Sequence, residues 1–428
     1  MRKGYKEIEN KNINIKVEKN SSNKNDKIKF FVWLFVLIFV YYQVFVLVSY
    51  TLGNEPKGSM WLYNGINKIV TSIAPQAKET TEEHKLTIAA LGDIYSSTKI
   101  LNAAKTGGEY NFSESFAITK EILANYDVVL ASLNTPIADA KYITSTSAVH
   151  NAPKELLTNL KSIGITALAT ANNHIMDKGE TGVKTTIEQL QTIKIDQIGL
   201  NSGEEKVKPY IIEKNNIKIA VLSYMTTSNT KIAKGNEYLV NTLTEENIKT
   251  DMEYVKGQNV DYVICYLNIP NEDTTMVNGD QKTNVELLFE HGVNIVLGAG
   301  SKVVQGKLED LYELEDGTKN HAYVVYSLGD FYGSMDSDER KVSIGMDITF
   351  TKSITKDKEG NVIAEKTKKN MMFNPPLSFY TKVTKDYKVI NYPINKTIEE
   401  YDGGTIELDS KDYEKIKEAQ ADIKEILE

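Results

Sequence analysis

The stretch ALATANNHIMDKGETGVKTTIEQL, residues 167–190, decides the fold class. It begins with an apolar run of strand length and continues with the polar group Asn172-Asn173-His174. A helix-like stretch then follows over 179–192. A short apolar run with a helix after it is typical of α/β domains. In such domains ligands bind beyond the carboxyl ends of the strands, so the polar group lies where a binding site is expected.

The same alternation continues along most of the chain. Apolar runs of strand length lie at 86–91, 128–132, 167–171, 217–224, 262–267, 294–299 and 322–328. Helix-like stretches lie at 115–125, 154–163, 179–192, 243–256 and 281–291. Continuous apolar strands that alternate with helices indicate a layered α/β domain. Farther along, 343–352 and 376–392 read as strands, and the charged segment 353–370 as a hairpin or loop.

We therefore predict one α/β domain over residues 85–395. An amphipathic helix is expected within residues 396–428, the C-terminal segment. Its apolar face would be formed by Ile416, Ala419, Ile423 and Leu427. Cys265 lies inside an apolar run, so we predict a buried thiol rather than a nucleophile.

The composition excludes several classes of protein. The 428 residues carry a formal net charge of −8, which argues against nonspecific nucleic-acid binding because that needs a basic surface. The single cysteine excludes an internal disulfide framework and a cysteine-based zinc site. The chain has five histidines, so any metal site must rely on few imidazoles.

A long uncharged run near the N-terminus predicts a membrane anchor. Residues 30–52, FFVWLFVLIFVYYQVFVLVSYTL, are long enough to cross a bilayer as one helix. Residues 1–29 carry nine Lys or Arg and four Asp or Glu, so the positive-inside rule places this tail in the cytoplasm. Residues 53–84 would then form a stalk. The α/β domain is expected on the extracellular side of the cell membrane.

Polar or small residues follow many of the apolar runs. Because the carboxyl ends of parallel strands meet at one edge of a sheet, we expect these residues to lie together. A single Asp or Asn at such a position is often a turn or cap residue, but the agreement of several strand ends favours a binding site. The candidates are Asp93, Asn134, Asn173, His174, Asn268, Glu272, Gly300, Lys302 and Asp330.

Several stretches resemble, in the same order, the sequence blocks of the CapA/PgsA family of capsule and poly-γ-glutamate synthesis proteins. The blocks are LTIAALGDIY (86–95), SLNTPI (132–137), the stretch quoted above, YVICYLNIPNED (262–273), NIVLGAGSKVVQGKLE (294–309) and YSLGDF (326–331). The resemblance covers about residues 86–332. It implies a calcineurin-like metallophosphatase fold, which is an α/β/β/α sandwich.

The resemblance also implies a chemistry for the site. In the metallophosphatase superfamily a two-metal centre activates water and clamps a phosphate. By matching position, Asp93 and Asn173 would be metal ligands, and Asp93 and His174 would be catalytic. Glu272 matches an acidic residue of the family pattern.

The chain departs from that pattern where the family has three histidines. Asn268, Gly300 and Lys302 stand in their places, Asn134 replaces a carboxylate, and Asp330 replaces an asparagine. Imidazoles suit divalent transition metals, whereas a lysine repels them. We therefore expect that the dinuclear centre is lost and that no cofactor is needed, with bound Mn, Fe or Zn as the alternative.

Lys302 gives the site a second interpretation. Its charge, with His174 and the N–H groups of the 298–302 turn, would bind a carboxylate or phosphate. The polar side chains that would contact such a substrate are Asn134, Asn268, Glu272, Lys302 and Asp330. Equally, Lys302 would pair with Asp93, Glu272 or Asp330 and leave the site without a ligand.

The remaining histidines offer few substitutes for the missing ones. His150 lies in a loop from which it could reach the site. His291 and His321 precede strands, so they are expected at the opposite end of the sheet, and His84 would belong to the stalk.

The membrane segment and the resemblance together predict a single-pass, outward-facing protein. The resemblance implies that it supports synthesis or export of an anionic surface polymer, with poly-γ-glutamate as the family's example. Its partners would be the membrane, the polymer synthase and export subunits, and the polymer itself. One alternative is a metal-dependent phosphatase or phosphodiesterase with an altered centre. Another is a non-catalytic surface module, a pseudoenzyme that binds anions.

Overall fold

The computed structural model describes residues 22–51, 79–138, 149–203, 205–314, 317–333 and 335–428. The chain divides into two compact units, Met1–Lys78 and Glu79–Glu428. Most of the predicted cytoplasmic tail and most of the predicted stalk lie outside the described residues.

The described part of the first unit is helix α1, Ser22–Thr51. It includes the uncharged run from residue 30 onward, and apolar side chains such as Trp33 and Leu37 are exposed on it. Within the described residues, no helix combines the length and the apolar character that a membrane crossing requires. The transmembrane helix therefore stays a prediction.

The second unit is built on two sheets. The first has nine strands in the order β17-β16-β14-β1-β4-β5-β6, with β13 beside β1 and β15 beside β14. Strands β1, β4, β5 and β6 run parallel, and β14, β16 and β17 are antiparallel additions. The bounds are β1 Thr80–Ile94, β4 Val128–Leu133, β5 Ala167–Ala169, β6 Asp196–Ile198, β13 Asp330–Tyr332, β14 Val342–Lys356, β15 Lys368–Phe373, β16 Leu377–Val383 and β17 Val389–Pro393.

The second sheet has six strands in the order β11-β12-β10-β9-β8-β7. Its four central strands are parallel, and the two edge strands are antiparallel. The bounds are β7 Tyr210–Lys214, β8 Ile217–Met225, β9 Tyr262–Asn268, β10 Ile295–Ala299, β11 Val304–Glu313 and β12 Lys319–Leu328. A separate two-stranded ribbon is formed by β2 Lys105–Thr106 and β3 Glu109–Tyr110.

The helices begin and end at residues suited to those positions. Ser97, Thr244 and Asp409 accept backbone N–H groups as N-caps, and Asn278 forms a capping box with Gln281. The helices of this unit are α3 Thr98–Ala104, α4 Ala117–Leu123, α5 Lys154–Ser162, α6 Gly179–Ile193, α7 Glu245–Gly257, α8 Gly279–Glu290, α9 Ile394–Asp402 and α10 Ser410–Leu427. Short 3₁₀ turns lie at Ser113–Phe116, Glu237–Leu239, Glu339–Lys341 and Ala364–Lys366.

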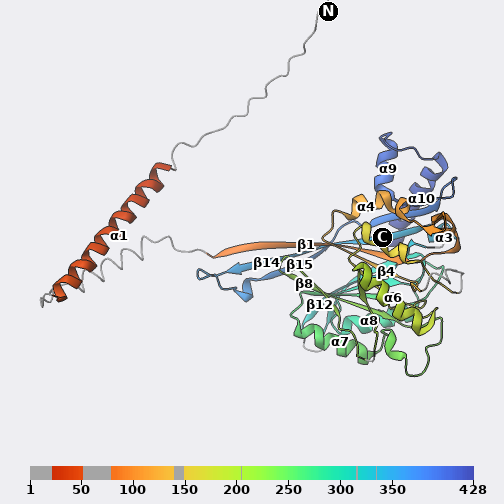
Figure 1. Ribbon diagram of the computed structural model, residues 1–428, viewed down its shortest axis with the longest axis horizontal. Helices are drawn as coiled ribbons and strands as arrows, with labels where there is room; N and C mark the ends of the chain where they lie inside the picture. The colour runs from red at the N-terminus through yellow and green to blue at the C-terminus, as the bar shows by residue number, and fades with distance from the viewer. Residues whose placement is uncertain (1–21, 52–78, 139–148, 204, 315–316, 334) are drawn as a thin grey trace, which may run out of the picture. The chain divides into compact units, whose positions relative to one another are not determined.

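The two sheets share one apolar core. Ile88 and Leu130 of the first sheet are buried with Val221, Tyr266 and Leu297 of the second. Helices α3, α4 and α5 cover the other face of the first sheet. Helices α7 and α8 cover the outer face of the second, beside β8 and β12 in Figure 1. The predicted α/β/β/α layering is therefore observed.

Several smaller predictions are confirmed. Ile416, Ala419 and Ile423 of α10 are buried in the shared core, and Leu427 is partly buried against it. Cys265 is buried in β9, and burial raises the pKa of its thiol well above the usual value.

Other boundaries differ from the prediction. Strand β1 begins at Thr80, so the last residues of the predicted stalk belong to the sheet, and His84 pairs with Lys352 of β14. This part of β1 is polar and largely exposed, so hydrophobicity gave no signal for it. By contrast, the segment 353–370, predicted as a hairpin or loop, does contain a hairpin, formed by the end of β14 and the start of β15. The C-terminal segment contains most of α9 in addition to α10.

Candidate functional site

The candidate residues converge at the carboxyl ends of the parallel strands, which we call the rim. Two hydrogen bonds join the sheets there. The backbone N–H of Gly300, after β10, donates to Asp93 Oδ2 on β1 at 2.7 Å. The backbone N–H of Asn173, after β5, donates to Asn268 Oδ1 on β9 at 3.2 Å. The structure thus brings these four residues together at the rim, as the sequence predicted.

Two buried aspartates lie side by side at the rim. Asp93 and Asp330 are register neighbours on the parallel strands β1 and β13, and both are almost fully buried. The Tyr95 hydroxyl donates to Asp330 Oδ2 at 3.0 Å. Burial raises the pKa of Asp93. Burial, and then the charge of Asp93, raise the pKa of Asp330 well above its usual value.

Several buried oxygen atoms at the rim have no hydrogen-bond partner among the described residues. We call four of them the rim oxygens: they are the Oδ1 atoms of Asp93, Asn134, Asn173 and Asp330. An unpaired buried acceptor costs about 1–3 kcal/mol. Such atoms therefore indicate a place for a cation or for ordered water.

His174 is held by an acidic partner that the sequence analysis did not select. Its Nδ1 lies 2.7 Å from Asp177 Oδ2, and both side chains are buried. The backbone N–H of His174 donates to Asn172 Oδ1 at 3.0 Å. The signal for Asp177 was its position three residues after His174, which puts both on one turn of chain. A carboxylate in this place fixes the orientation of the imidazole ring.

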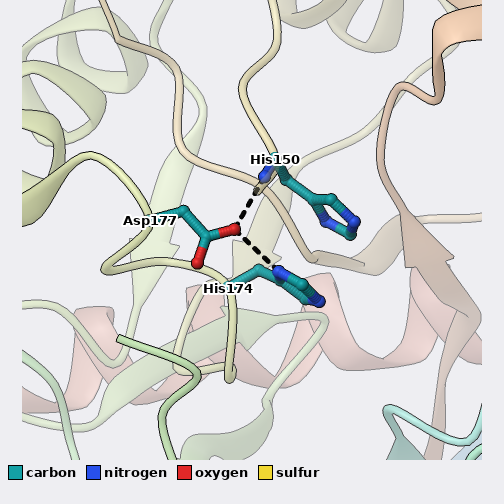
Figure 2. A group of neighbouring side chains, drawn as sticks. All are labelled: His150, His174 and Asp177. Carbon is teal, nitrogen blue, oxygen red and sulfur yellow. Dashed lines mark hydrogen bonds and ion pairs between the residues drawn. The ribbon is translucent and has the colours of Figure 1, made fainter. Parts of the chain in front are cut away.

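His150, in the loop before α5, lies next to His174 and Asp177. The sequence analysis noted that this loop could bring His150 to the site. Its ring stacks on that of His174, with centroids 3.5 Å apart and planes at 13°. Figure 2 shows the two side chains next to each other beside Asp177. The His150 backbone N–H donates to Asp177 Oδ2 at 2.7 Å. Its Nδ1 lies 3.1 Å from the carbonyl oxygen of Asn134. Burial, helped by the nearby His174, lowers the pKa of His150 to about 4, so the ring is neutral at pH 7.

The comparisons with known proteins bear on this region. The family described as bacterial capsule synthesis protein PGA_cap matches residues 87–335, which is more than half of the chain. The chain belongs to this family. The match begins in β1 and ends just after β13, so it includes every rim residue named above.

Two relatives carry related names. The capsule biosynthesis protein CapA of Bacillus anthracis is 25% identical over 260 residues, covering 58% of this chain and 60% of the relative. The PGA biosynthesis protein CapA of Bacillus subtilis (strain 168) is 24% identical over 261 residues, covering 60% and 65%. The chain thus spans less than two thirds of the length of either relative.

Two solved structures with a similar course of the chain have lower sequence identity to it than these relatives. A 5'-nucleotidase precursor from Thermus thermophilus is 11% identical with a TM-score of 0.37, covering 68% of this chain and 54% of that protein. The protein TT1561 of the same organism is 10% identical with a TM-score of 0.33, covering 67% and 98%.

Lys302, one of the three residues that stand where the resemblance implies histidines, forms an ion pair. Lys302 Nζ lies 2.6 Å from Glu272 Oε2, and the Lys302 side chain is 9% exposed. Of the three partners considered for Lys302, Glu272 is the one the structure shows. Arg340 lies beside this pair, 4.0 Å from Glu272, and it binds Asp273 through two nitrogens at 2.5 Å.

The chemistry of the rim decides how well a metal fits. The rim oxygens come from two carboxylates and two amides, which are kinds of group that bind hard divalent cations. The ammonium group of Lys302 stands where the resemblance implies a histidine ligand, and its charge disfavours a cation beside it. The described rim residues therefore offer oxygen ligands and lack the histidines that the resemblance implies.

The His150, His174 and Asp177 group fits a chelating metal site less well. Asp177 Oδ2 already accepts two hydrogen bonds, from the His150 backbone and from the His174 ring. The lone pairs of stacked imidazoles run nearly parallel, so both rings cannot point at one ion. These three residues, although their side chains are close enough to share an ion, are better described as two stacked histidines that both bind one carboxylate, His174 through its ring and His150 through its backbone N–H.

Proposed function

We propose that the chain is a membrane-anchored, outward-facing protein that supports synthesis or export of an anionic surface polymer of the poly-γ-glutamate type. The observation that carries this proposal is the capsule synthesis family match over residues 87–335. Both relatives are named for capsule or PGA biosynthesis. Its partners would be the polymer synthase and export subunits in the membrane.

The membrane anchor in this proposal is α1. Its uncharged run is flanked by the basic residues of the N-terminal tail, which favours a cytoplasmic N-terminus and an extracellular second unit. Exposed aromatic and aliphatic side chains, including Trp33, Tyr41 and Phe45, are costly in water and suited to lipid.

The role we propose is non-catalytic or weakly catalytic, with a degenerate metal site. Replacement of family histidines by Asn268, Gly300 and Lys302 removes nitrogen ligands, and the Lys302–Glu272 pair at 2.6 Å adds a fixed positive charge. A hydrolytic centre that relies on two metal ions would lack these nitrogen ligands at the described rim residues.

A complementation experiment tests the proposal. In a strain that lacks the chain, the full-length wild type should restore cell-bound anionic polymer, measured by its mass and glutamate content. The Asp93→Ala variant should restore at least half of that amount if the role is not hydrolytic. Failure of the wild type to change polymer yield would contradict the polymer role. Glu213→Ala, an exposed substitution far from the rim, is the matched control.

A specific observation supports a second candidate function, a metal-dependent phosphatase or phosphodiesterase with an altered centre. The buried rim oxygens and the His174–Asp177 pair at 2.7 Å would provide a cation site and a positioned imidazole. A cation bound there would supply Lewis-acid chemistry, while His174 would hold or release a proton at a leaving oxygen. Hydrolysis of a phosphodiester that disappears in both Asp93→Ala and His174→Ala would favour this candidate over the first.

The anion-binding module has less support. It requires the Lys302 ammonium group to bind the carboxylate or phosphate of a ligand, but that group already donates to the Glu272 carboxylate. An anion would have to displace a carboxylate whose side chain is partly exposed.

A further inference from the structure

We propose that Lys302 and Arg340 form a binding site for two neighbouring carboxylates of the anionic polymer. In the ligand-free chain the carboxylates of Glu272 and Asp273 occupy this site as an internal mimic of the polymer, which displaces them when it binds. The inference rests on the proposed function, and it adds the cationic site and the groups that block it. It follows from the ion pairs at the rim, from the exposure of their members and from the backbone of the loops that carry them.

Two ion pairs lie side by side where the loop after β9, the turn after β10 and the 3₁₀ turn Glu339–Lys341 meet. Lys302 Nζ donates to Glu272 Oε2 at 2.6 Å. Arg340 donates from Nε and Nη2 to the two oxygens of Asp273, at 2.5 Å each. A guanidinium that binds both oxygens of a carboxylate has the usual geometry of carboxylate recognition. Arg340 Nη2 is also 4.0 Å from Glu272 Oε2, so the two cations form one continuous positive site.

This positive site lies beside the buried aspartates of the rim. The pKa of Asp330, which burial raises, is lowered in part by the charges of Lys302 and Arg340. The backbone also joins the acidic loop to the turn that carries the lysine, because the Asp273 N–H donates to the carbonyl oxygen of Ser301 at 3.1 Å. A polymer that binds the two cations would therefore pass along the rim.

The cations of this site are largely buried, and the carboxylates are accessible. The Lys302 side chain is 9% exposed and that of Arg340 is 15% exposed. The side chains of Glu272 and Asp273 are 39% and 53% exposed. A buried cation needs an anion beside it, whereas an exposed carboxylate loses little when it turns into water. Another carboxylate can therefore replace either acidic side chain while the cations stay in place.

The backbone is strained at both loops that carry these groups. Asp273 has a φ of 60° and Lys302 a φ of 66°, both in the left-handed region. A short polar side chain such as that of Asp273 tolerates this conformation, but the side chain of a lysine gives it no local support. Non-glycine residues keep such a conformation where the surroundings enforce it, most often at functional sites. The turn after β10 thus holds the Lys302 ammonium group in one position, as a preorganised binding site requires.

The arrangement of the charges indicates the class of ligand. Lys302 alone is a weak anion site, because the single carboxylate of Glu272 fills it. The second cation changes this, since two adjacent cations favour a chain that carries carboxylates in series. Once one carboxylate of such a chain has bound, the next binds as an intramolecular event. Glu272 and Asp273 are themselves two successive carboxylates, so the loop already shows how a polycarboxylate would fit.

Binding of γ-linked glutamate to the full-length protein in detergent micelles tests the inference. A short fluorescein-labelled oligomer is titrated with protein at low salt, and its fluorescence anisotropy is measured. The double variant Glu272→Gln/Asp273→Asn removes the internal mimic and keeps its shape, so we expect the oligomer to bind about 5- to 10-fold more tightly than to the wild type. The double variant Lys302→Gln/Arg340→Gln removes the site, so binding should weaken ~10- to 100-fold.

A matched control separates the site from the overall charge. Glu245→Gln/Glu246→Gln removes two negative charges from exposed positions of α7 and should leave the affinity unchanged. A gain in affinity does not arise from poor folding, so the Glu272→Gln/Asp273→Asn variant decides the outcome even if the cation variants are unstable. No binding by this variant, an affinity equal to that of the wild type, or an equal gain in the control would each overturn the inference. A wild type that restores polymer in cells despite such a result would leave the proposed function standing, whereas the expected affinities without any effect on polymer yield would contradict the proposed function alone.

Discussion

Aspartates stand at both ends of the parallel strands, and their surroundings are opposite. At the amino end, Asp261 precedes β9. Its Oδ2 accepts the Lys218 backbone N–H at 2.9 Å, and its carboxylate lies 2.8 Å from Lys369 and 3.0 Å from Lys352. At the carboxyl end, Asp93 and Asp330 lie next to each other, and neither forms an ion pair with a Lys or Arg side chain in the described part of the chain.

The pKa shifts follow this difference. Burial acts to raise the pKa of Asp261, but the hydrogen bonds and charges of its lysine partners outweigh it, so the pKa is lowered. The same holds for Asp127 before β4, which Lys214 and Thr87 surround. At the rim, burial prevails and the pKa values of Asp93 and Asp330 are raised. The aspartates at the amino end of the strands thus stabilise the fold. Those at the rim are buried without a cationic partner, which is typical of binding sites.

The largest expected effect is at the amino end. Asp261→Ala removes the carboxylate that joins β8 to β14 and β15, and it leaves two ammonium groups and a backbone N–H without their acceptor. We expect a loss of about 2–3 kcal/mol in the free energy of unfolding, measured by urea denaturation in the presence of a chelator. Glu213→Ala, which removes an exposed partner of Lys218, should cost less than about 0.5 kcal/mol. Equal losses of unfolding free energy in the two variants would show that Asp261 stabilises the fold no more than an exposed ion-pair partner does.

At the rim the same kind of substitution should have the opposite sign. Asp330→Asn removes a buried charge next to Asp93 and retains a side chain of the same shape. We expect the chelated protein to gain about 1–2 kcal/mol. Differential scanning calorimetry of the two proteins would show a higher unfolding temperature for the variant. A loss as large as that of Asp261→Ala would show that the two ends do not differ.

The pH dependence sharpens the comparison. The folded pKa of Asp261 lies below its ordinary value of 3.8, so its stabilisation is present above pH 3.8 and is lost as the pH falls through the folded pKa. The folded pKa of Asp330 lies above 3.8, so its favourable contribution is present below pH 3.8 and is lost as the pH rises through the folded pKa.

The stability of each variant should therefore differ more from that of the wild type as the pH rises. Asp261→Ala should be less stable than the wild type, and Asp330→Asn should be more stable. In chelated samples between pH 3 and 7, the deficit of Asp261→Ala should grow with pH, and the advantage of Asp330→Asn should also grow. Unfolding midpoints measured across this range would check both. Parallel curves for the wild type and Asp330→Asn would mean that Asp330 titrates normally.

The apolar pattern was sufficient for a layered α/β domain and for the approximate rim, and the family resemblance supplied the α/β/β/α arrangement. The apolar runs located the buried strands because both faces of those strands are covered. Such strands are continuously apolar and do not alternate between apolar and polar residues. The polar start of β1 was missed for the converse reason: Thr80 and its neighbours pair with β14 while their side chains remain largely exposed.

The sequence predicted which strand-end residues lie at the site, but it did not predict which side chains they contact. Lys302 had three acidic partners available, and the choice of Glu272 depends on the turn after β10, where Lys302 has a φ of 66°. His150 and Tyr95 stack because a loop and a strand end meet in space, which no local pattern encodes. Asp177 lies three residues after His174 and does not directly follow an apolar run, so the strand-end rule did not select it.

The smallest expected effects concern the lysines at the two ends. Lys302→Gln removes a charge whose partner, Glu272, is 39% exposed, so stability should change by less than about 1 kcal/mol. If one cation binds at the rim, its affinity should rise about 5-fold, because a like charge is removed. Lys369→Gln at Asp261 should instead lower stability and leave the affinity for Mn²⁺ unchanged. Isothermal titration of the two variants separates these outcomes, and weaker Mn²⁺ binding by Lys302→Gln would show that Lys302 organises the rim through Glu272 rather than opposing a cation.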